Sequence, residues 1–369
     1  MKKIHVTTPL LPSLDDLTPL LEDIWDRRWL TNNGYYHHLL EKRLCDYLGV
    51  DYICLFSNGT LALMAALQAL DLNGEVITTP YSFVATSHAI KLNNLTPVFV
   101  DIDPETFNLD PSKVEAAITN NTCAILPVHV YGSPCDVEHI KSIAEKYNLK
   151  VIYDAAHAFG VKKNNYSILN WGDLSILSFH ATKAYSTIEG GAIVCHTLEM
   201  KEKLEQLKNF GFESETELSL LGINAKLNEV QSAFGLASLS LIDDAISRRK
   251  QVAFSYRKFL SNIDGISYLD DSNDTHHNYS YFPIIIDKVK YGMSRDELFN
   301  KLKENNVFAR RYFYPLITDF ELYKDSKICG NISIAKNISD NVICLPMHHE
   351  LSNEDLCHIL NLIYEFKRK

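Results

Sequence analysis

Residues 178–183, with the sequence SFHATK, decide the fold together with the segment IEGGA at residues 188–192. The two segments place one lysine, Lys183, between two short apolar runs of the kind found in strands. Upstream, residues 151–157 (VIYDAAH) have the pattern of a buried strand that delivers Asp154 at its end. Open α/β sheets bind their ligands at the carboxyl ends of such strands, so this pattern predicts a ligand site.

Lys183 and Asp154 together suggest a particular chemistry. A lysine that can form a Schiff base and a carboxylate that can keep a pyridinium nitrogen protonated are the two parts that a pyridoxal phosphate enzyme needs. Each residue alone has a plainer interpretation, because a loop lysine is commonly a solvated charge and an aspartate after a strand commonly caps a helix. The combination of the two is what favours a cofactor site.

The composition describes an ordinary globular protein and limits its partners. The chain has 369 residues, 46% of them apolar and 22% charged, which is enough for one large domain and a smaller one. The formal net charge of −10 opposes binding to nucleic acid or to an anionic membrane surface. The N-terminal stretch lacks a secretory pattern and no apolar run reaches 18 residues, so we expect a cytoplasmic protein without a membrane span.

The cysteines and the histidine pairs do not indicate a metal. No two cysteines form a C-x-x-C pair, and the histidine pairs at 37–38, 276–277 and 348–349 lack acidic or cysteine partners at ligand spacing. We therefore expect neither a zinc site nor a disulfide framework. The cysteines are Cys45, Cys54, Cys123, Cys135, Cys195, Cys329, Cys344 and Cys357.

Strand-like and helical segments alternate between about residues 50 and 200. This alternation predicts an α/β fold with a mainly parallel sheet covered by helices. Strands are expected at 52–56, 75–79, 98–101, 124–130 and from 151, and helices at 61–70, 82–92, 111–118 and 136–147. After Gly191 we expect helices at 198–209, 228–241, 295–305 and 353–369 and a strand at 281–286, with a domain boundary near residue 245.

Three blocks carry a family resemblance: DAAHA from Asp154, SFHATK ending at Lys183, and EGG from Glu189. In this order they resemble the DegT/DnrJ/EryC1/StrS sugar aminotransferases. The resemblance implies the aspartate-aminotransferase-like fold (fold type I) of pyridoxal phosphate enzymes. It implies a large cofactor domain over residues 14–244 with a mainly parallel mixed sheet, a smaller α+β domain over 245–369 against which residues 1–13 pack, and a homodimer with shared active sites.

The resemblance also assigns cofactor residues. It implies catalytic roles for Lys183 and Asp154, and for His157 near the cofactor ring. The segment 57–60 (SNGT) lies between a strand and a helix, where free N–H groups bind anions, and the family match gives the phosphate to Asn58, Gly59 and Thr60. Ser178 is implied as a further phosphate ligand.

Two further cofactor contacts follow from the family pattern. In the run 79–86 (TPYSFVAT) Phe83 matches the aromatic residue that stacks on the pyridine ring, with Tyr81 as the second choice. Asn224 matches the asparagine of a G-Y-N-x-R motif that reaches the phosphate of the other subunit. Here Ile223 replaces the tyrosine and Lys226 replaces the arginine.

Substrate contacts are expected from several segments. Adjacent arginines and aromatic rings at 310–315 (RRYFYP) suit a diphosphate and a sugar or nucleobase, although two adjacent arginines are also common at a solvated edge. The segment 29–34 (WLTNNG) and a family L-P-M-H pattern supply the others. The expected residues are Thr31, Asn32, Asn33, His180, Arg310, Arg311, Tyr312, Tyr314 and His348.

The function that the resemblance implies is transamination of a nucleotide-linked keto-6-deoxy sugar. L-glutamate would be the donor, and the cofactor would cycle between pyridoxal and pyridoxamine phosphate. The opening of the chain favours dTDP-4-keto-6-deoxy-D-glucose as substrate and dTDP-4-amino-4,6-dideoxy-D-glucose as product, for O-antigen lipopolysaccharide or another surface glycan.

Several alternatives stay open or are disfavoured by particular residues. A 3-keto-sugar aminotransferase of the same family remains an alternative, and a noncatalytic regulator that keeps the fold is a further one. The dehydratases of the family carry a histidine in place of the lysine, whereas Lys183 is intact. A dinucleotide-dependent oxidoreductase would need a G-x-G-x-x-G turn, which the sequence lacks.

Overall fold

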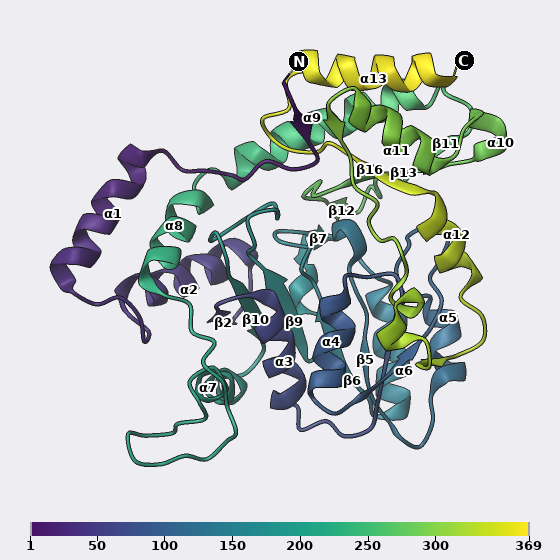
Figure 1. The fold of residues 1–369 in the computed structure, drawn as a ribbon. Helices are drawn as coiled ribbons and strands as arrows, with labels where there is room; N and C mark the ends of the chain where they lie inside the picture. The colour runs from purple at the N-terminus through teal and green to yellow at the C-terminus, as the bar shows by residue number, and fades with distance from the viewer. Residues whose placement is uncertain (1, 368–369) are drawn as a thin grey trace.

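The computed structural model describes residues 2–367. Met1, in the expected N-terminal segment, and residues 368–369, in the expected final helix, lie outside the described residues. A central sheet carries helices on its two faces, and the C-terminal third of the chain lies across one end of the sheet (Figure 1). No helix within residues 2–367 has the length and apolar character needed to cross a membrane.

The central sheet has eight strands in the order β15-β4-β3-β5-β6-β9-β10-β2. All neighbours pair in parallel except β10, which is antiparallel to both β9 and β2. The expected α/β class with a mainly parallel mixed sheet is thus confirmed. The strands are β2 (Tyr52–Phe56), β3 (Glu75–Thr78), β4 (Thr96–Phe99), β5 (Thr122–Leu126), β6 (Lys150–Asp154), β9 (Leu174–Ser178), β10 (Gly191–Cys195) and β15 (Lys327–Ile328).

Side chains alternate between two apolar layers along each central strand. In β2, Ile53 and Leu55 join one core, and Cys54 and Phe56 join the other. Because both faces of the sheet are covered, the strand is almost continuously apolar. The layer with Phe56 packs against α3 (Gly59–Ala69), α4 (Val84–Leu92) and α7 (Leu198–Leu207), and the other against α2 (Tyr35–Leu48) and α6 (Val137–Tyr147).

Two expected strands end earlier than the apolar runs suggested. The strand expected at 124–130 is β5, which stops at Leu126, because Pro127 has no N–H to donate; Val128 then makes only an isolated bridge to Asp154. The run expected at 98–101 pairs over Thr96–Phe99. Asp101 instead accepts backbone hydrogen bonds from Ile334 (3.1 Å) and Ala335 (2.8 Å) at the start of α12 (Ser333–Asn341).

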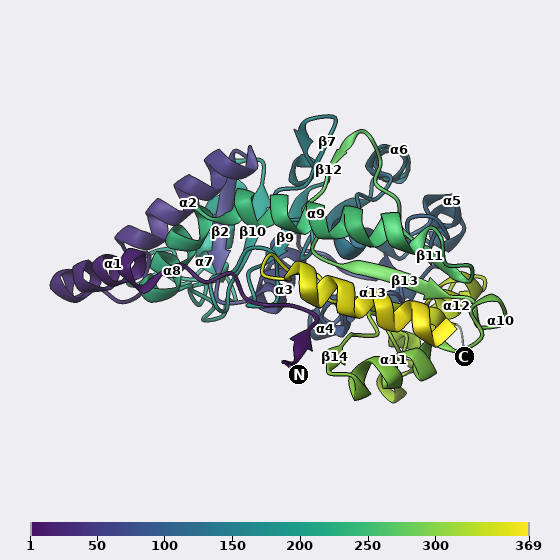
Figure 2. The ribbon, with the colours of Figure 1, turned by 90° about the horizontal axis from the view of Figure 1, so that it is seen from above.

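The C-terminal region has its own antiparallel sheet in the order β11-β13-β16. Helix α9 (Ile242–Leu260) runs without a break through residue 245, and Figure 2 shows it beside α13 (Asn353–Lys367). The N-terminal strand β1 (Ile4–His5) pairs with β14 (Val307–Phe308). The remaining elements are β7 (Lys162–Lys163), β8 (Tyr166–Ser167), β11 (Ile266–Tyr268), β12 (Thr275–His276), β13 (Phe282–Ile286), β16 (Val342–Leu345), α5 (Pro111–Val114), α8 (Glu229–Leu239), α10 (Lys288–Tyr291) and α11 (Arg295–Glu304).

Helix α1 (Leu14–Arg27) projects from the body of the molecule (Figures 1 and 2). Ser13 caps its start through a bond from the Asp16 amide (3.1 Å). The inner face of α1 packs through Ile24 in a small cluster with Tyr36 and Ala233. Large apolar side chains nearby stay exposed, including Trp25 at 64% and Trp29 at 56%, which leaves an uncovered apolar surface.

The antiparallel strand β10 brings two functional loops together. Its first residue, Gly191, pairs with Phe56 on one side and with Ser178 on the other. A Cβ at Gly191 would lie 2.6 Å from the carbonyl carbon of Asn58. Glycine is therefore required where β10 passes the turn between β2 and α3, and the strand ends that carry Asn58 and Ser178 meet there.

Candidate active site

The carboxyl ends of β2, β6 and β9 border a cavity of about 430 Å³. This is the edge at which the sequence predicted a ligand site. Most of the predicted cofactor and substrate residues line it, although they come from segments far apart in the chain. The predicted residues in its wall are Asn58, Gly59, Thr60, Phe83, Asp154, His157, Ser178, His180, Lys183, Arg310 and Tyr312.

Lys183 lies in a tight turn after β9, where its N–H donates to the carbonyl of His180 (2.9 Å). Its Nζ donates to the hydroxyl of Tyr281 (3.4 Å) and lies 5.9 Å from the centre of that ring. Burial lowers the pKa of the Lys183 amine to about 8, and the Asp154 carboxylate partly offsets this by favouring the charged form. A substantial fraction of the amine is therefore neutral near physiological pH, as a nucleophile or base must be.

Asp154 ends β6 with a side chain that is only 5% exposed. Its carboxylate accepts hydrogen bonds from the Thr86 hydroxyl (2.8 Å) and from the Ala156 amide (3.1 Å). Burial raises the pKa of Asp154, and these hydrogen bonds and Lys183 oppose the rise. The element that follows β6 is the strand β7, not a helix, so the plainer role of a helix cap does not apply.

One hydrogen bond and two aromatic contacts fix the orientation of the His157 imidazole. Its Nδ1 accepts from the amide of Tyr131 (3.1 Å), so a neutral imidazole carries its proton on Nε2. The ring lies parallel to that of Phe313, with centroids 5.9 Å apart, and tilted against Tyr281 at 4.7 Å. Burial lowers the pKa of His157 well below its ordinary value, which keeps the ring neutral.

An anion cradle lies at the start of α3. Asn58 caps the helix by accepting a hydrogen bond from the amide of Leu61 (2.9 Å). The first two residues of the helix, Gly59 and Thr60, line the cavity, and backbone N–H groups of a first helical turn can bind an anion. A Cβ at Gly59 would lie 3.0 Å from the Cβ of Ser178, so the backbone and the serine hydroxyl are close. Amide donors, a buried carboxylate and a lysine amine around one cavity fit pyridoxal phosphate.

The two candidates for stacking on the cofactor ring have different positions. Phe83 lines the cavity with 60% of its surface exposed, just before α4. Tyr81 is completely buried and its hydroxyl bonds that of Tyr131 (2.6 Å). Of the two, Phe83 is the one whose ring is available to a ligand in this cavity.

The rim of the cavity carries charged and polar side chains. The Nδ1 of His180 bonds the Thr182 hydroxyl (2.8 Å), and its Nε2 lies 3.5 Å from the carboxylate of Glu189. Arg310 follows β14 and is exposed, while Tyr312 stands edge-on to Tyr281 at 5.7 Å. These groups can contact an extended polar ligand that enters the cavity.

The other predicted substrate residues do not line this cavity. Arg311 pairs with Asp296 (2.9 Å), and Tyr314 packs beneath the guanidinium of Arg295 (4.3 Å), so both side chains are engaged by the start of α11 instead of the cavity. His348 is buried behind the wall. Thr31, Asn32 and Asn33 lie near α7, where Asn33 donates to Glu205 (3.0 Å), and Asn224 is exposed on the segment before α8.

Several residues that shape the site were not predicted from the sequence. Thr86 orients Asp154, Tyr281 contacts Lys183, and Phe313 packs on His157. Thr86 belongs to a run that was already singled out for its aromatic residue, so its hydroxyl was a missed signal. Tyr281 opens the strand-like run at 281–286, whose sequence does not reveal that it crosses to the lysine.

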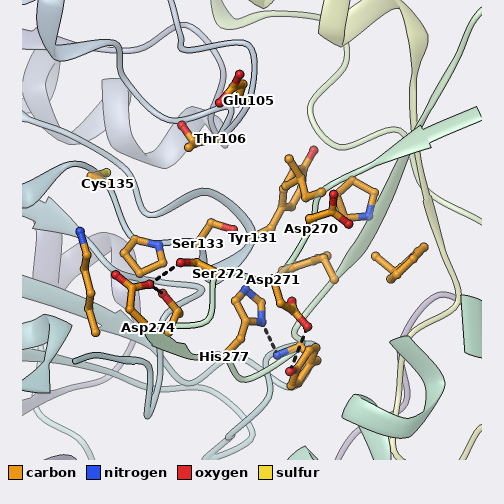
Figure 3. A pocket seen from close by; sticks show the side chains of 18 of the residues that line it. Glu105, Thr106, Tyr131, Ser133, Cys135, Asp270, Asp271, Ser272, Asp274 and His277 are labelled. Atoms are coloured by element: carbon orange, nitrogen blue, oxygen red, sulfur yellow. Dashed lines mark hydrogen bonds between the residues drawn. The ribbon is translucent and has the colours of Figure 1, made fainter. Parts of the chain in front are cut away.

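Tyr281 also lines a second cavity of about 350 Å³. Figure 3 shows polar residues of its wall, among them Asp271, Asp274 and His277. Its polar groups are largely satisfied by one another: Asp274 accepts from Ser272, and His277 accepts from the amide of Tyr279 (2.7 Å). Arg257 makes a bidentate pair with Asp271 (2.7 and 2.8 Å). This cavity lacks the lysine and carboxylate pair of the first one.

One buried cluster has the residue types of a metal site. Oxygen and nitrogen atoms of His37, Glu41 and Glu205 lie within 4.8 Å of one another. The Nζ of Lys208 lies 2.7 Å from Glu205, 3.3 Å from His37 and 4.0 Å from Glu41. The lysine ammonium therefore already supplies the cation that neutralises these carboxylates.

The α/β fold and the lysine, carboxylate and anion cradle define an aminotransferase of the pyridoxal phosphate class. The family described as the DegT/DnrJ/EryC1/StrS aminotransferase family matches residues 15–364, and the chain belongs to it. The chain is 55% identical over 366 residues to a dTDP-4-amino-4,6-dideoxy-D-glucose transaminase of Shigella dysenteriae, covering 99% of this chain and 100% of the relative.

A second relative and a solved structure agree with this family assignment. An Escherichia coli protein with the same description is 48% identical and covers 98% of both chains. Among solved structures, DesI in the presence of its TDP-sugar product superimposes with a TM-score of 0.95 at 32% identity, covering 100% of this chain and 94% of the other. The expected family and fold are thus confirmed.

The pKa of Lys183 gives a testable prediction. In cofactor-free protein, acetylation of Lys183 by acetic anhydride, followed by peptide mass spectrometry, is expected to reach half its maximal rate near pH 8 rather than near 10.5. In Asp154→Asn the midpoint falls further, because the carboxylate that favours the ammonium is gone. Exposed Lys42 serves as the internal reference. A wild-type midpoint near 10.5, or an upward shift in Asp154→Asn, contradicts this electrostatic account.

Proposed function

We propose that this protein transfers an amino group from L-glutamate to carbon 4 of dTDP-4-keto-6-deoxy-D-glucose. The product is dTDP-4-amino-4,6-dideoxy-D-glucose, which supplies O-antigen or another surface glycan. The observation that carries the proposal is the convergence of Lys183, Asp154 and the start of α3 on one cavity. The two relatives described as transaminases of this sugar support the substrate assignment.

Different residues of the site bind the cofactor phosphate, protonate its ring and move protons. Pyridoxal phosphate, when bound, supplies a carbonyl that takes up and releases an amino group, and a ring that accepts electrons; pyridoxamine phosphate is its aminated form. Gly59, Thr60 and Ser178 hold the phosphate, and buried Asp154 keeps the ring nitrogen protonated. The Lys183 amine holds the cofactor and moves the proton at the reacting carbon, since its lowered pKa provides the neutral base.

The rim supports binding of a nucleotide-linked sugar. Arg310 presents a guanidinium without a carboxylate within ion-pair distance in the described part of the chain, and such a group suits a diphosphate. His180 and Tyr312 add donors around the entrance. Phe83 offers an apolar face to the cofactor ring.

Lys183→Ala tests the catalytic assignment. We expect the variant to lose transamination while it still binds some cofactor noncovalently, because the phosphate cradle and Asp154 remain. Turnover is measured with the keto sugar and glutamate, and the product is identified by mass and NMR. Borohydride reduction of the wild type must place the cofactor on the Lys183 peptide. Substantial turnover by the variant contradicts the catalytic assignment of Lys183. A product aminated at carbon 3 favours the alternative function, a 3-keto-sugar aminotransferase.

The active unit is a two-fold homodimer in which Asn224 serves the site of the partner. Asn224 is exposed and does not line the cavity of its own chain. The next residue, Ala225, accepts a hydrogen bond from the amide of Ser57 (2.7 Å), in the turn between β2 and α3. The uncovered apolar side chains Trp25 and Trp29 offer an area for a second copy. An isologous interface would give both sites the same borrowed residue.

Subunit mixing tests this sharing. Asn224→Ala and Lys183→Ala are each expected to be poorly active or inactive. If Asn224 acts across the interface, a mixed dimer has one site with both wild-type residues, and random mixing restores about a quarter of the sites. If Asn224 acts within its own chain, mixing restores nothing. Failure of mixed samples to recover activity, or a fully active monomer in light scattering, refutes the shared site.

A further inference from the structure

Arg249 on α9 is a buried cation that has no counter-ion within residues 2–367. It is 1% exposed, and its Nη1 donates to the carbonyl of Met347 (3.3 Å). Its Nε and Nη2 have no hydrogen-bond partner within residues 2–367, and no ion pair of these residues includes it. Isolated charges are costly to bury, and buried N–H groups are nearly always paired.

Other arginines of the chain show what Arg249 lacks. Arg257, two turns further along the same helix, makes its bidentate pair with Asp271. Arg295, which is 2% exposed, donates through Nε to Asp296 (2.7 Å) and through Nη1 to two backbone carbonyls. Among residues 2–367, the other buried guanidinium, that of Arg295, thus has partners for its Nε and Nη1, whereas Arg249 has two open donors.

Two histidine nitrogens near Arg249 lack partners as well. The buried Nδ1 atoms of His348 and His349, on the turn after β16, have no hydrogen-bond partner among residues 2–367. Burial, followed by the charge of Arg249, lowers the pKa of His348 to about 4, so it adds a neutral ring. Four unpaired polar atoms of three neighbouring residues thus gather at one place.

This cluster lies next to the catalytic cavity. Phe282 pairs with Leu345, so the antiparallel register brings Tyr281 beside the turn that carries His348. Tyr281 in turn accepts a hydrogen bond from the amine of Lys183. The guanidinium of Arg249 is near enough to Tyr281 to lower the pKa of its hydroxyl against the larger effect of burial. Tyr281, which lines the cavity, is therefore a neighbour of both Lys183 and Arg249.

The two open donors of Arg249 match a carboxylate. Nε–H and one Nη2–H lie parallel along one edge of a guanidinium, which is the edge that binds both oxygens of a carboxylate. We propose that Arg249, assisted by His348, binds a carboxylate of the amino-acid donor, with Tyr281 shifting to admit it. The inference rests on the proposed function and adds to it the donor-binding residue.

The position of the cluster favours the donor over the sugar nucleotide. Both ligands are anionic, but the exposed cation of the cavity, Arg310, stands at the rim, where a long diphosphate can enter. Arg249 is enclosed and does not line the cavity, and its two open N–H groups suit a planar carboxylate. An α-amino acid whose nitrogen lies at the lysine has its carboxylate only two bonds away from that nitrogen.

The two half-reactions separate the roles. Arg249→Met is expected to raise the glutamate concentration for half-maximal conversion of the cofactor absorbance by about 30-fold or more, because a buried charge-assisted pair is lost. The keto-sugar half-reaction, started from protein loaded with pyridoxamine phosphate, should keep its half-saturating sugar concentration. Arg248→Met, at the exposed neighbour on the same helix, is the matched control and should resemble wild type in both.

A binding measurement on cofactor-free protein provides the second readout. Glutarate, a dicarboxylate without an amine, should raise the Tm of wild type and of Arg248→Met but not that of Arg249→Met. The Tm of Arg249→Met without glutarate checks that this variant is folded. If Arg249→Met does not fold, Arg249→Lys takes its place, because lysine keeps the positive charge but lacks the two parallel N–H groups of the guanidinium edge.

The outcomes are distinct. A wild-type glutamate dependence in the folded Arg249 variant, or weakened sugar binding with intact donor binding, overturns the inference and leaves the proposed function standing. A wild-type protein that glutamate does not convert overturns the proposed function and this inference with it.

Discussion

The burial of the Asp154 carboxylate within reach of the Lys183 charge is the constraint on which the rest of the site depends. An ionised carboxylate in an enclosed position needs hydrogen bonds, and Thr86 and Ala156 provide them. The Thr86 hydroxyl is itself bonded to that of Ser82 (2.8 Å), so the start of α4 holds the carboxylate from one side. The same carboxylate favours the charged form of Lys183, whereas burial opposes it. The balance leaves an amine that can change its protonation state during a reaction.

The sheet holds these groups at fixed positions. Asp154 ends β6 and Ser178 ends the neighbouring β9, so parallel pairing sets their separation before any loop is considered. The antiparallel β10 then returns past both Ser178 and the turn at Asn58, and only glycine fits at residue 191. Lysine loop, carboxylate and anion cradle are therefore parts of one rigid sheet edge. Such preorganisation is what lets a site stabilise a transition state without first reorganising.

The sequence predicted the parts of the site that are encoded next to strand ends. Lys183, Asp154 and the turn at Gly59 could be identified because apolar runs mark the strands that carry them. Arg311 and Tyr314 were expected at the site with Arg310, but they contact Asp296 and Arg295, whereas residues 310, 312 and 313 line the cavity. Tyr281 and Arg249 could not be predicted, since their approach to the lysine depends on how β13 and α9 pack. Helices α1 and α2 were also missed.

The account's central claim is that Asp154 acts as a charge on the cofactor ring and not as a structural cap. The direct measurement is the rate of the glutamate half-reaction in Asp154→Asn, compared with wild type at saturating cofactor and alongside the Tm of both proteins. The amide keeps the shape and most hydrogen bonds of the side chain but not its charge. The account predicts a rate lower by roughly a hundredfold or more with little change in Tm. A near wild-type rate in the folded variant would contradict it.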